Sequence, residues 1–552
     1  MRVTNTMISN SARNHVSRAK SKLLTAEEQY TTEKKIQRPS DDPTIAVRSL
    51  KYRGTMAQIT QYVEKNVKDA MSWMDTTQGA LDGINSILID MKGNLDQGAN
   101  DYLAMDERNS VLSTLKQYVS SVLSDNANAD YSGRYVFTGY RTDTSLLFGS
   151  ITKNLSYEIR ENFVYSDVGS INVVTGGASY TAGNTAQDYV DQAPKKDSVY
   201  RMQLAYKNCS NSPLDNGETP TGVREDYVTF TTSYSCVYDA TNAGNISFTD
   251  PNTTVTDADT GAVLTGAPPM GTRVTVTNTM TATTKASTDK ADATATPPAT
   301  EAYDVGDDEL VYLYDTGEIL MGKNIYSSIQ QNKADITVDY VKTEFDKQDI
   351  RPEMYFKCKS YDSVSGKTTK YSNPAGQDIS YEVNFSQTMR VNTQGLDAIS
   401  TEIYRAIDYL TQTIEAMDNV ENQIADVEKM IANAAPGDDI KALEKLKETL
   451  ETEKSLRMTV MTEAFGKGLT MVDNAQEKLN VALANLGTRR KRLELTYDKL
   501  SDQYLDTEEQ LSNNEDIDIY DAFVNLTQAD NLYQYSLSST SKILGNTLLD
   551  YI

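Results

Sequence analysis

Apolar residues recur at alternating intervals of four and three along much of this chain, and that rhythm constrains the fold more than any other feature of the sequence. In the N-terminal half the seam comprises Val63, Val67, Ala70, Met74, Thr77, Leu81, Ile84, Leu88, Met91 and Leu95. A second seam, at intervals of seven, comprises Phe465, Val472, Leu479, Leu486, Leu493 and Leu500. Seams of this length are typical of coiled coils, so both halves of the chain predict long helices that need helical partners.

Length and charge narrow the classes of protein that this chain can belong to. At 552 residues it is too long for one ordinary core. The 53 Lys and Arg residues against 78 Asp and Glu residues give a net charge of -25, which repels phosphate backbones and anionic lipid headgroups. We therefore expect neither nucleic acid nor membrane as a partner. The N-terminal residues lack the apolar core of a secretion signal, and no stretch approaches the roughly 18 apolar residues of a membrane span.

The residues that usually carry chemistry do not form a recognisable site in the sequence. Cys209, Cys236 and Cys358 lack both a CxxC spacing and a nearby histidine, so we expect free thiols, with a bridge between Cys209 and Cys236 left open. His15, the one histidine of the chain, has no evident nucleophile to activate. Phosphate-binding loops, dinucleotide fingerprints and HExxH motifs are absent from the sequence. These observations predict no enzyme activity, no metal site and no cofactor.

The pattern changes twice along the chain, which predicts an α+β fold. The helical rhythm gives way after residue 140 to a region rich in Thr, Ser, Gly and Tyr, which is typical of strands and turns, and it returns near residue 396. We expect a long coiled-coil helical rod of paired N- and C-terminal segments with a central β-rich inserted head. The predicted regions are an N-terminal assembly helix (1–42), rod helices (43–140), the head (141–395) with a threonine-rich mobile segment (251–303), rod helices (396–513) and a C-terminal assembly helix (514–552).

Finer features are predicted within these regions. Residues 1–38 read as one amphipathic helix, and a second helix follows from residue 43 to about residue 128 with a break within 93–101. The clearest hairpin joins 310–314 to 319–321. We expect a helix to end and the chain to turn back at 434–438, and the helix that follows to have a kink or joint at 466–468.

The run from Arg38 to Pro43 predicts a junction between two helices. Pro39 and Pro43 disfavour helix in the residues before them, while Asp42 followed by Pro43 is typical of an N-cap and a first-turn proline. Asp41 and Asp42 could also be read as paired catalytic carboxylates, but adjacent side chains beside a proline fit capping better. We assign Pro39, Asp41, Asp42 and Pro43 to this helix junction.

The terminal helices carry apolar stripes too thin to hold them as isolated helices. Apolar burial contributes about 25 cal/mol per Å², whereas ordering each residue costs roughly 1 to 2 kcal/mol. We therefore expect these helices to fray until other subunits pack on them, and the long heptads to face other subunits. The candidate assembly interface comprises Val16, Leu23, Leu479, Leu486, Leu493, Leu500, Phe523, Leu526, Tyr533, Leu537, Leu544 and Leu548.

Several motifs at both ends resemble the flagellin superfamily. The stretch at 30–46 is similar to its N-terminal signature, and Pro39-Ser40-Asp41-Asp42-Pro43 resembles the version in its hook-filament junction branch. The segment Gly133–Gly139 is similar to that branch too, as are 376–383 and 389–395 more weakly. Near the other end, 485–494, 515–518 and 548–552 resemble the C-terminal pattern of the superfamily.

This resemblance implies a structural subunit of the bacterial flagellum. Such a subunit would be exported unfolded through the flagellar type III apparatus and would act outside the cell at the hook-filament junction. The implied partners are the first hook-associated protein, flagellin and copies of the chain itself, with an export chaperone as a further candidate. Filament flagellin is the alternative reading, and a flagellum-borne hydrolase with its activity in the head is a more remote one.

Overall fold

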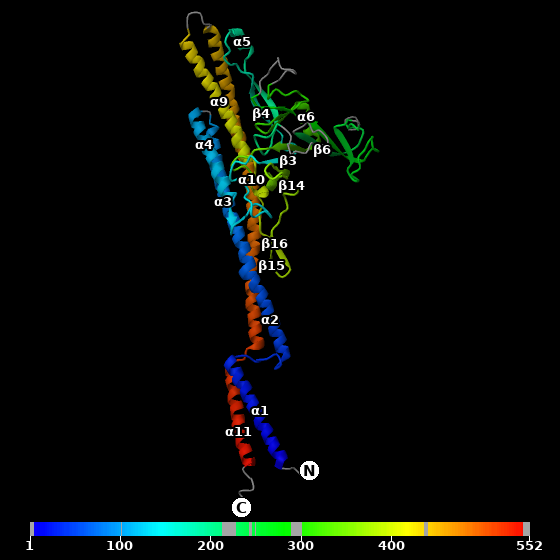
Figure 1. The fold of residues 1–552 in the computed structure, drawn as a ribbon, viewed down its shortest axis with the longest axis vertical. Helices are drawn as coiled ribbons and strands as arrows, with labels where there is room; N and C mark the ends of the chain where they lie inside the picture. Colours follow the sequence, from blue (N-terminus) through cyan, green and yellow to red (C-terminus); the bar gives the residue numbers. More distant parts are fainter. Residues whose placement is uncertain are drawn as a thin grey trace, which may run out of the picture. The chain divides into compact units, whose positions relative to one another are not determined.

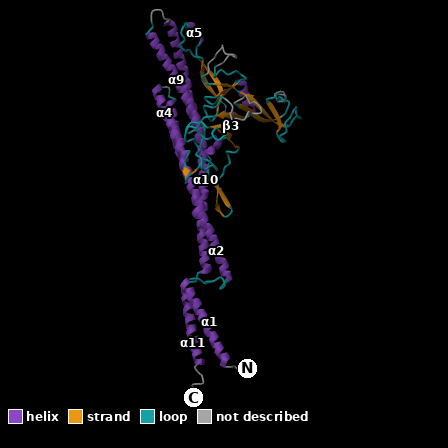
Figure 2. Ribbon diagram, in the orientation of Figure 1, coloured by secondary structure: helices purple, strands orange, loops and turns teal. Residues whose placement is uncertain are grey.

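The computed structural model describes residues 5–100, 102–211, 228–241, 246–248, 250–288, 301–434 and 440–544. The chain divides into two compact units. The terminal unit comprises residues 1–72, 380–390 and 488–552, and the central unit comprises 73–379 and 391–487. Helical regions at the two ends of the sequence flank a β-rich region, which confirms the predicted α+β class (Figure 2).

The terminal unit is mainly helical. Its elements are α1 (Asn5–Thr32), α2 (Pro43–Gln61), the π-helical turn η1 (Tyr62–Val67), the start of α3 (Lys68–Gly98), the end of α10 (Ile440–Glu515) and α11 (Ile519–Leu544). Helices α1 and α11 lie side by side (Figure 1). The prediction of a helix over residues 1–38 was wrong at its C-terminal end. Glu33 adopts a left-handed φ of 59°, and Lys34 forms a β-bridge with Asp516 in place of another helical turn.

A β-hairpin also belongs to the terminal unit, although residues 141–395 were predicted as one head. It consists of β15 (Ser380–Asn384) and β16 (Gln387–Arg390). The hairpin packs on η1. The ring centres of Tyr62 and Phe385 lie 5.4 Å apart, and the Asn66 side-chain amide donates to the Glu382 carbonyl at 2.8 Å. The predicted head therefore contributes to both units.

The central unit contains a long helical assembly, joined by contacts that confirm the predicted pairing of the two seams. Its long elements are α3 from Trp73 onward, α4 (Met105–Ser121), η2 (Val122–Asn126), α9 (Glu402–Ala432) and the part of α10 up to Gly487. Lys92 pairs with Asp473, and a Cβ added to Gly98 would lie 2.2 Å from the Phe465 ring. Helices α9 and α10 run antiparallel, because Lys447 contacts Glu428 and Lys454 contacts Glu421.

Two helix predictions have different outcomes. The break within 93–101 is confirmed, since α3 ends at Gly98 and α4 begins at Met105. No break interrupts the helix at 466–468, because α10 continues through these residues and Gly468 packs against Leu95 and Leu410, so the kink expected there stays a prediction. Of the turn expected at 434–438, residues 435–438 lie outside the described residues.

Two sheets make up most of the strand structure of the central unit. The first has the order β14-β13-β3-β12-β6-β8-β7 and is antiparallel throughout. Its strands are β3 (Leu155–Val164), β6 (Thr229–Val237), β7 (Thr253–Asp257), β8 (Arg273–Thr281), β12 (Asp335–Lys342), β13 (Lys357–Asp362) and β14 (Lys367–Tyr371). The second has the order β4-β5-β11-β10-β9. Its strands are β4 (Gly169–Thr175), β5 (Lys195–Gln203), β9 (Thr283–Lys285), β10 (Leu310–Leu313) and β11 (Glu318–Met321).

Short elements complete the central unit. They are the hairpin strands β1 (Asp130–Tyr131) and β2 (Arg134–Tyr135), the 3-10 turn η3 (Tyr165–Asp167), and the helices α5 (Ala186–Asp191), α6 (Lys323–Asn332), α7 (Pro352–Tyr355) and α8 (Gly395–Ala398).

The β-rich region confirms one strand prediction and corrects another. Strands β10 and β11 form the hairpin predicted at 310–321. The mobile segment predicted at 251–303 was wrong for 253–281, where Val255, Val274 and Val276 are buried in β7 and β8. In β8 the threonines alternate with valines. This period of two indicates a strand, but the prediction rested on the threonine-rich composition and missed it. Residues 289–300 lie outside the described residues. The prediction of free thiols is confirmed for all three cysteines.

Candidate assembly interface

An alanine seam holds the two terminal helices together. Ala12, Ala19 and Ala26 of α1 are buried, and so are Ala522 and Ala529 of α11. Val16, Leu23, Leu526 and Tyr533 are only half-buried. Each buried methyl contributes about 0.8 kcal/mol, which is small beside the roughly 1 to 2 kcal/mol that ordering each residue of a 28-residue and a 26-residue helix costs. The contact between α1 and α11 is therefore a weak one.

Large apolar side chains on these two helices point to solvent. Tyr520 is 84% exposed, Tyr535 73% and Met7 62%. The exposed large apolar residues of the pair are Met7, Ile8, Leu24, Tyr30, Ile519, Tyr520, Phe523, Val524, Leu532, Tyr535 and Leu537. We call this set the terminal apolar surface. Single exposed apolar residues are ordinary on a protein surface, but eleven large ones on two paired helices make this surface the candidate contact with other proteins.

Besides the half-buried residues named above, the predicted interface residues fall into exposed, undescribed and fully buried groups. Phe523 and Leu537 belong to the terminal apolar surface. The side chain of Leu544 and all of Leu548 lie outside the described residues. The heptad leucines of α10, namely Leu479, Leu486, Leu493 and Leu500, are fully buried within the single chain.

Assigning those α10 leucines to contacts with other subunits was therefore a mistake. A heptad seam requires a partner helix, but its spacing does not say whether that helix belongs to the same chain. Here the chain supplies the partner itself, as the contact of Gly98 with Phe465 shows. The exposed terminal residues, and not the long heptads, are available to other subunits.

The helix junction has the predicted capping geometry. The Asp42 carboxylate accepts hydrogen bonds from the backbone N–H groups of Thr44 at 2.8 Å and Ile45 at 3.2 Å, and Pro43 occupies the first turn of α2. The Asp41 carboxylate accepts from the Arg38 N–H at 2.9 Å and closes the turn that contains Pro39. All four predicted junction residues thus act on the backbone path between α1 and α2.

An ionic cluster ties the same junction to the end of α10, and sequence reasoning assigned it no role. Glu515 is 5% exposed and accepts hydrogen bonds from Lys34 at 2.8 Å and from Arg53 at 2.8 and 3.0 Å. Lys34 also pairs with Asp516. Beside them, the Asn514 amide donates to Ser49 at 2.8 Å. We call Lys34, Arg53, Glu515 and Asp516 the junction cluster.

Proton affinities in the junction cluster follow from these contacts. Burial acts to raise the pKa of Glu515, but the hydrogen bonds from Lys34 and Arg53 outweigh it and lower that pKa below its usual value. Hydrogen bonds to Asp516 and Glu515 raise the pKa of Lys34. Lys34 and Glu515 are thus both charged near neutral pH. The one sequence signal for it was the adjacent acid pair at the end of the long helix.

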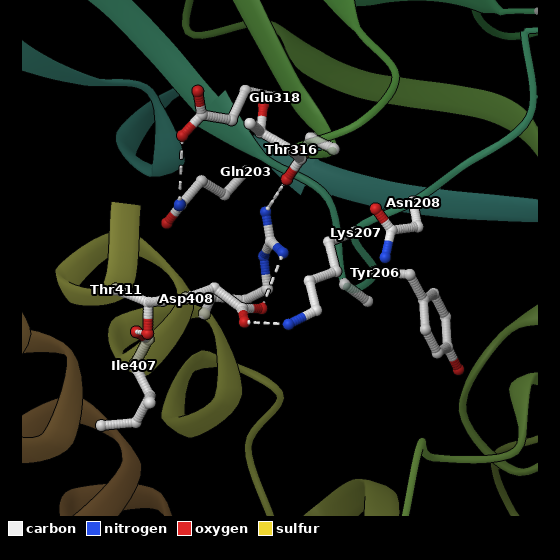
Figure 3. Close-up of polar contacts among 12 residues, drawn as sticks. Gln203, Tyr206, Lys207, Asn208, Thr316, Glu318, Ile407, Asp408 and Thr411 are labelled. Carbon is white, nitrogen blue, oxygen red and sulfur yellow. Dashed lines mark hydrogen bonds and ion pairs between the residues drawn. The ribbon is translucent and has the colours of Figure 1, made fainter. Parts of the chain in front are cut away.

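In the central unit, an ionic network around the buried Arg405 docks α9 on the β-rich region (Figure 3). The Arg405 guanidinium donates to the Thr316 carbonyl at 2.5 Å and to Asp408 at 3.2 Å, and Lys207 donates to the other oxygen of Asp408 at 2.7 Å. Gly317, in this turn, has a φ of 65°, and a Cβ there would lie 1.9 Å from the Tyr206 carbonyl. The turn therefore requires glycine.

A second buried pair lies near this contact. Arg201 and Glu318 meet at 2.6 Å with exposed fractions of 7% and 1%, and Gln203 approaches the same carboxylate at 3.5 Å. The Arg201 guanidinium lies 4.1 Å from the centre of the Tyr409 ring, a cation-π distance. Arg201 contacts both Glu318 of β11 and the Tyr409 ring of α9, and this arrangement holds α9 against the sheet.

The described residues do not assemble the groups that a chemical site would need. No cluster of three or more His, Cys, Asp or Glu side chains among them has the geometry to bind a metal ion. In the same part of the chain, no helix has the length and apolar character needed to cross a bilayer. The Asp257 carboxylate accepts hydrogen bonds from the backbone N–H groups of Asp259 at 3.0 Å and Thr260 at 2.8 Å, which close a turn.

Both ends of the chain match models of known protein families. Residues 3–142 match the bacterial flagellin N-terminal helical region, and residues 469–552 match the bacterial flagellin C-terminal helical region. The chain is similar to flagellar hook-associated protein 3 of Escherichia coli, at 26% identity over 21% of this chain and 37% of that protein. It is also similar to flagellar hook-associated protein 3 of Salmonella typhimurium, at 23% identity over 26% of this chain and 45% of that protein. The matches thus span less than half the length of these relatives.

Solved structures with some likeness to the chain include FlgL of Xanthomonas campestris and hook-associated protein 3 of Legionella pneumophila. The first is 10% identical over 83% of this chain and 98% of that chain, with a TM-score of 0.26. The second is 10% identical over 84% of this chain and 97% of that chain, with a TM-score of 0.27. Scores this low do not establish a common overall fold. What the family models show is that this chain carries the N-terminal and C-terminal helical regions of bacterial flagellin at its two ends, on either side of a β-rich region.

Proposed function

We propose that this chain is a structural subunit of the bacterial flagellum that joins the hook-associated zone to the flagellin filament, and that it is not an enzyme. The terminal apolar surface is the observation that carries the proposal. It lies on the two helices whose sequences match the flagellin end regions, and a weak alanine seam holds those helices together. Exposed aromatic residues are costly to leave in water, so their number on these helices favours a surface that another protein covers.

Assembly would supply the stability that the terminal pair lacks. Burying several large side chains, each worth about 1.5 to 3 kcal/mol, stabilises the pair far more than its buried alanines do. Ordering on contact also suits export of an unfolded chain, because the terminal helices gain most of their stability only at the assembly site. The proposed location is therefore outside the cell, in the flagellum.

The proposed partners are the first hook-associated protein, flagellin and further copies of this chain, with an export chaperone before assembly. Both curated relatives carry the name flagellar hook-associated protein 3, which favours the junction over the filament. Filament flagellin is the second candidate, because the two family models describe bacterial flagellin itself.

A charge placed in the terminal apolar surface tests the proposal. Phe523→Asp removes a 55% exposed ring, so we expect the protein to fold and to be exported but to be missing from purified flagella. The matched control is Asn525→Asp, which adds the same charge to an exposed polar position of α11 and should incorporate normally. Quantitative immunoblots of culture medium and purified flagella measure both. Normal incorporation of the Phe523→Asp protein would argue against the role of this surface.

A further inference from the structure

Helix α2 presents an uncovered face that combines apolar and basic residues. Val47 and Leu50 are 68% and 74% exposed, and Gly54 and Ala57 continue the same face at helical spacing. Arg48 and Lys51 flank this stripe, and no described residue forms an ion pair with either. The sequence of α2 contains three basic residues and no acidic ones. Because Arg53 is held by Glu515, Arg48 and Lys51 are the cations left for an outside partner.

The end of α10 presents a complementary face. Leu495 and Leu505 are 59% and 61% exposed, and they alternate with acidic residues at spacings of three and four. The acidic residues from 495 to 509 are Asp498, Asp502, Asp506, Glu508 and Glu509, against the single Lys499. All five are exposed, and none forms an ion pair with a described residue.

We propose that the basic face of α2 in one copy binds the acidic face of α10 in a second copy. The proposal rests on the function proposed above and specifies one contact between copies. Each face offers two large aliphatic side chains, and the charges around them are opposite in sign. A contact between two α2 faces, or between two α10 faces, would place like charges together. The favoured contact is therefore head-to-tail. It leaves the α10 face of the first copy and the α2 face of the second free to bind further copies.

This arrangement explains why the two faces carry their charges unpaired in the single chain. Charge complementarity contributes mainly to partner choice and to the rate of encounter, while the aliphatic side chains supply the apolar burial. A head-to-tail contact repeats from copy to copy and closes into a ring when the rotation per copy divides a full turn. The acidic net charge of -25 also requires a local attraction of this kind, since whole chains repel one another.

Charge swaps on the full-length protein test the contact. One variant carries Arg48→Glu with Lys51→Glu, and the other carries Asp502→Lys with Asp506→Lys. The control, Lys367→Glu with Lys370→Glu on exposed positions of β14, changes the net charge as the first variant does. Sedimentation velocity over a range of concentrations, at about 10 mM and about 1 M salt, measures self-association where the screening length is about 30 Å and about 3 Å.

The expected pattern is specific to a head-to-tail contact. Each variant alone should associate at least about tenfold more weakly than the wild type in low salt, because the two substituted residues now face charges of their own sign and the attraction between the faces is lost. An equal mixture of the two variants should recover association, since each then meets the opposite charge on the other. High salt should weaken self-association of the wild type and reduce the differences in association between the wild type, the variants and their mixture. The control should behave as the wild type does.

In sedimentation velocity, the inference is overturned by a wild type that stays monomeric in low salt, by variants that associate as the wild type does, or by a mixture that fails to recover. Recovery excludes simple misfolding of either variant. Failure of the proposed function is separately visible, because labelled wild-type protein would then be missing from flagella whatever its self-association. Variants that enter flagella normally would refute this contact and leave the proposed function standing.

Discussion

Replacing Glu161 with glutamine should change how the stability of the central unit depends on pH. Glu161 lies on β3 with 5% of its surface exposed, and one oxygen accepts hydrogen bonds at 3.1 Å from the Ala205 N–H and from the Tyr340 hydroxyl. Burial raises the pKa of Glu161 to about 7, against the two hydrogen bonds and the charge of Arg405, which lower it. The carboxyl group of Glu161 therefore stays protonated in the folded protein over a pH range in which the same group is ionised in the unfolded chain.

The sign and size of the effect follow from that range. An unfolded glutamate has a pKa of about 4.3, so between about pH 4.3 and 7 the folded state binds more protons than the unfolded state. The free energy of unfolding then falls as pH rises, by about 1.4 kcal/mol per pH unit. The total loss across the window is on the order of 4 kcal/mol, and it is complete above the folded pKa. Glutamine keeps the shape but does not titrate, so Glu161→Gln should become more stable relative to the wild type as pH rises.

Urea unfolding followed by tryptophan fluorescence measures this difference. Trp73 is the one tryptophan of the chain, it is 1% exposed, and it belongs to the same unit as Glu161. Subtracting the wild-type free energy from that of Glu161→Gln at pH 5, 6, 7 and 8 removes contributions from all other groups. The control is Glu344→Gln, at a carboxylate 62% exposed. A difference that stays constant from pH 5 to pH 8, or that falls with pH, would refute the reasoning.

Three further predictions concern the helices. Leu486→Ala should cost about 2 to 5 kcal/mol of unfolding free energy because it opens a cavity in the seam, whereas Leu495→Ala, at a 59% exposed position, should cost less than about 0.5 kcal/mol by urea unfolding. Asp42→Ala should cost about 1 kcal/mol through loss of the N-cap and should leave the α2 amides near Thr44 less protected in hydrogen exchange. Because the pKa of Glu515 is lowered in the fold, its contribution is present above about pH 4.3 and lost as pH falls through the folded pKa. Glu515→Gln should therefore weaken hydrogen-exchange protection around Lys34 at pH 7 and have little effect in strong acid.

The sequence predicted the features that local chemistry determines. Asp42 and Pro43 cap and open α2 because carboxylate capping and a fixed φ act within a few residues. The hairpin of β10 and β11 formed where turn residues separate two β-prone runs. The pairing of α3 with α10 also followed from pattern, because each carries an apolar seam long enough to need a helical partner.

Features that depend on tertiary contacts could not be predicted from the sequence. The burial of Leu486 and Leu493 inside the single chain could not be distinguished from burial between chains by spacing alone. The end of α1 depends on a β-bridge between Lys34 and Asp516, which lie far apart in sequence. The buried pair of Arg201 and Glu318 offers no signal either, because charged residues on strands usually face solvent.

Imaging of a single labelled position tests the central claim most directly. Val364, in the turn between β13 and β14, is 77% exposed, and Cys209 and Cys358 are buried, so Val364→Cys in a Cys236→Ser background gives one accessible thiol. Intact flagella carrying this protein and labelled with a maleimide dye should show one spot where the filament begins. Label along the whole filament would identify a flagellin and contradict the junction role, and unlabelled flagella in cells that export the protein would contradict any structural role in the flagellum.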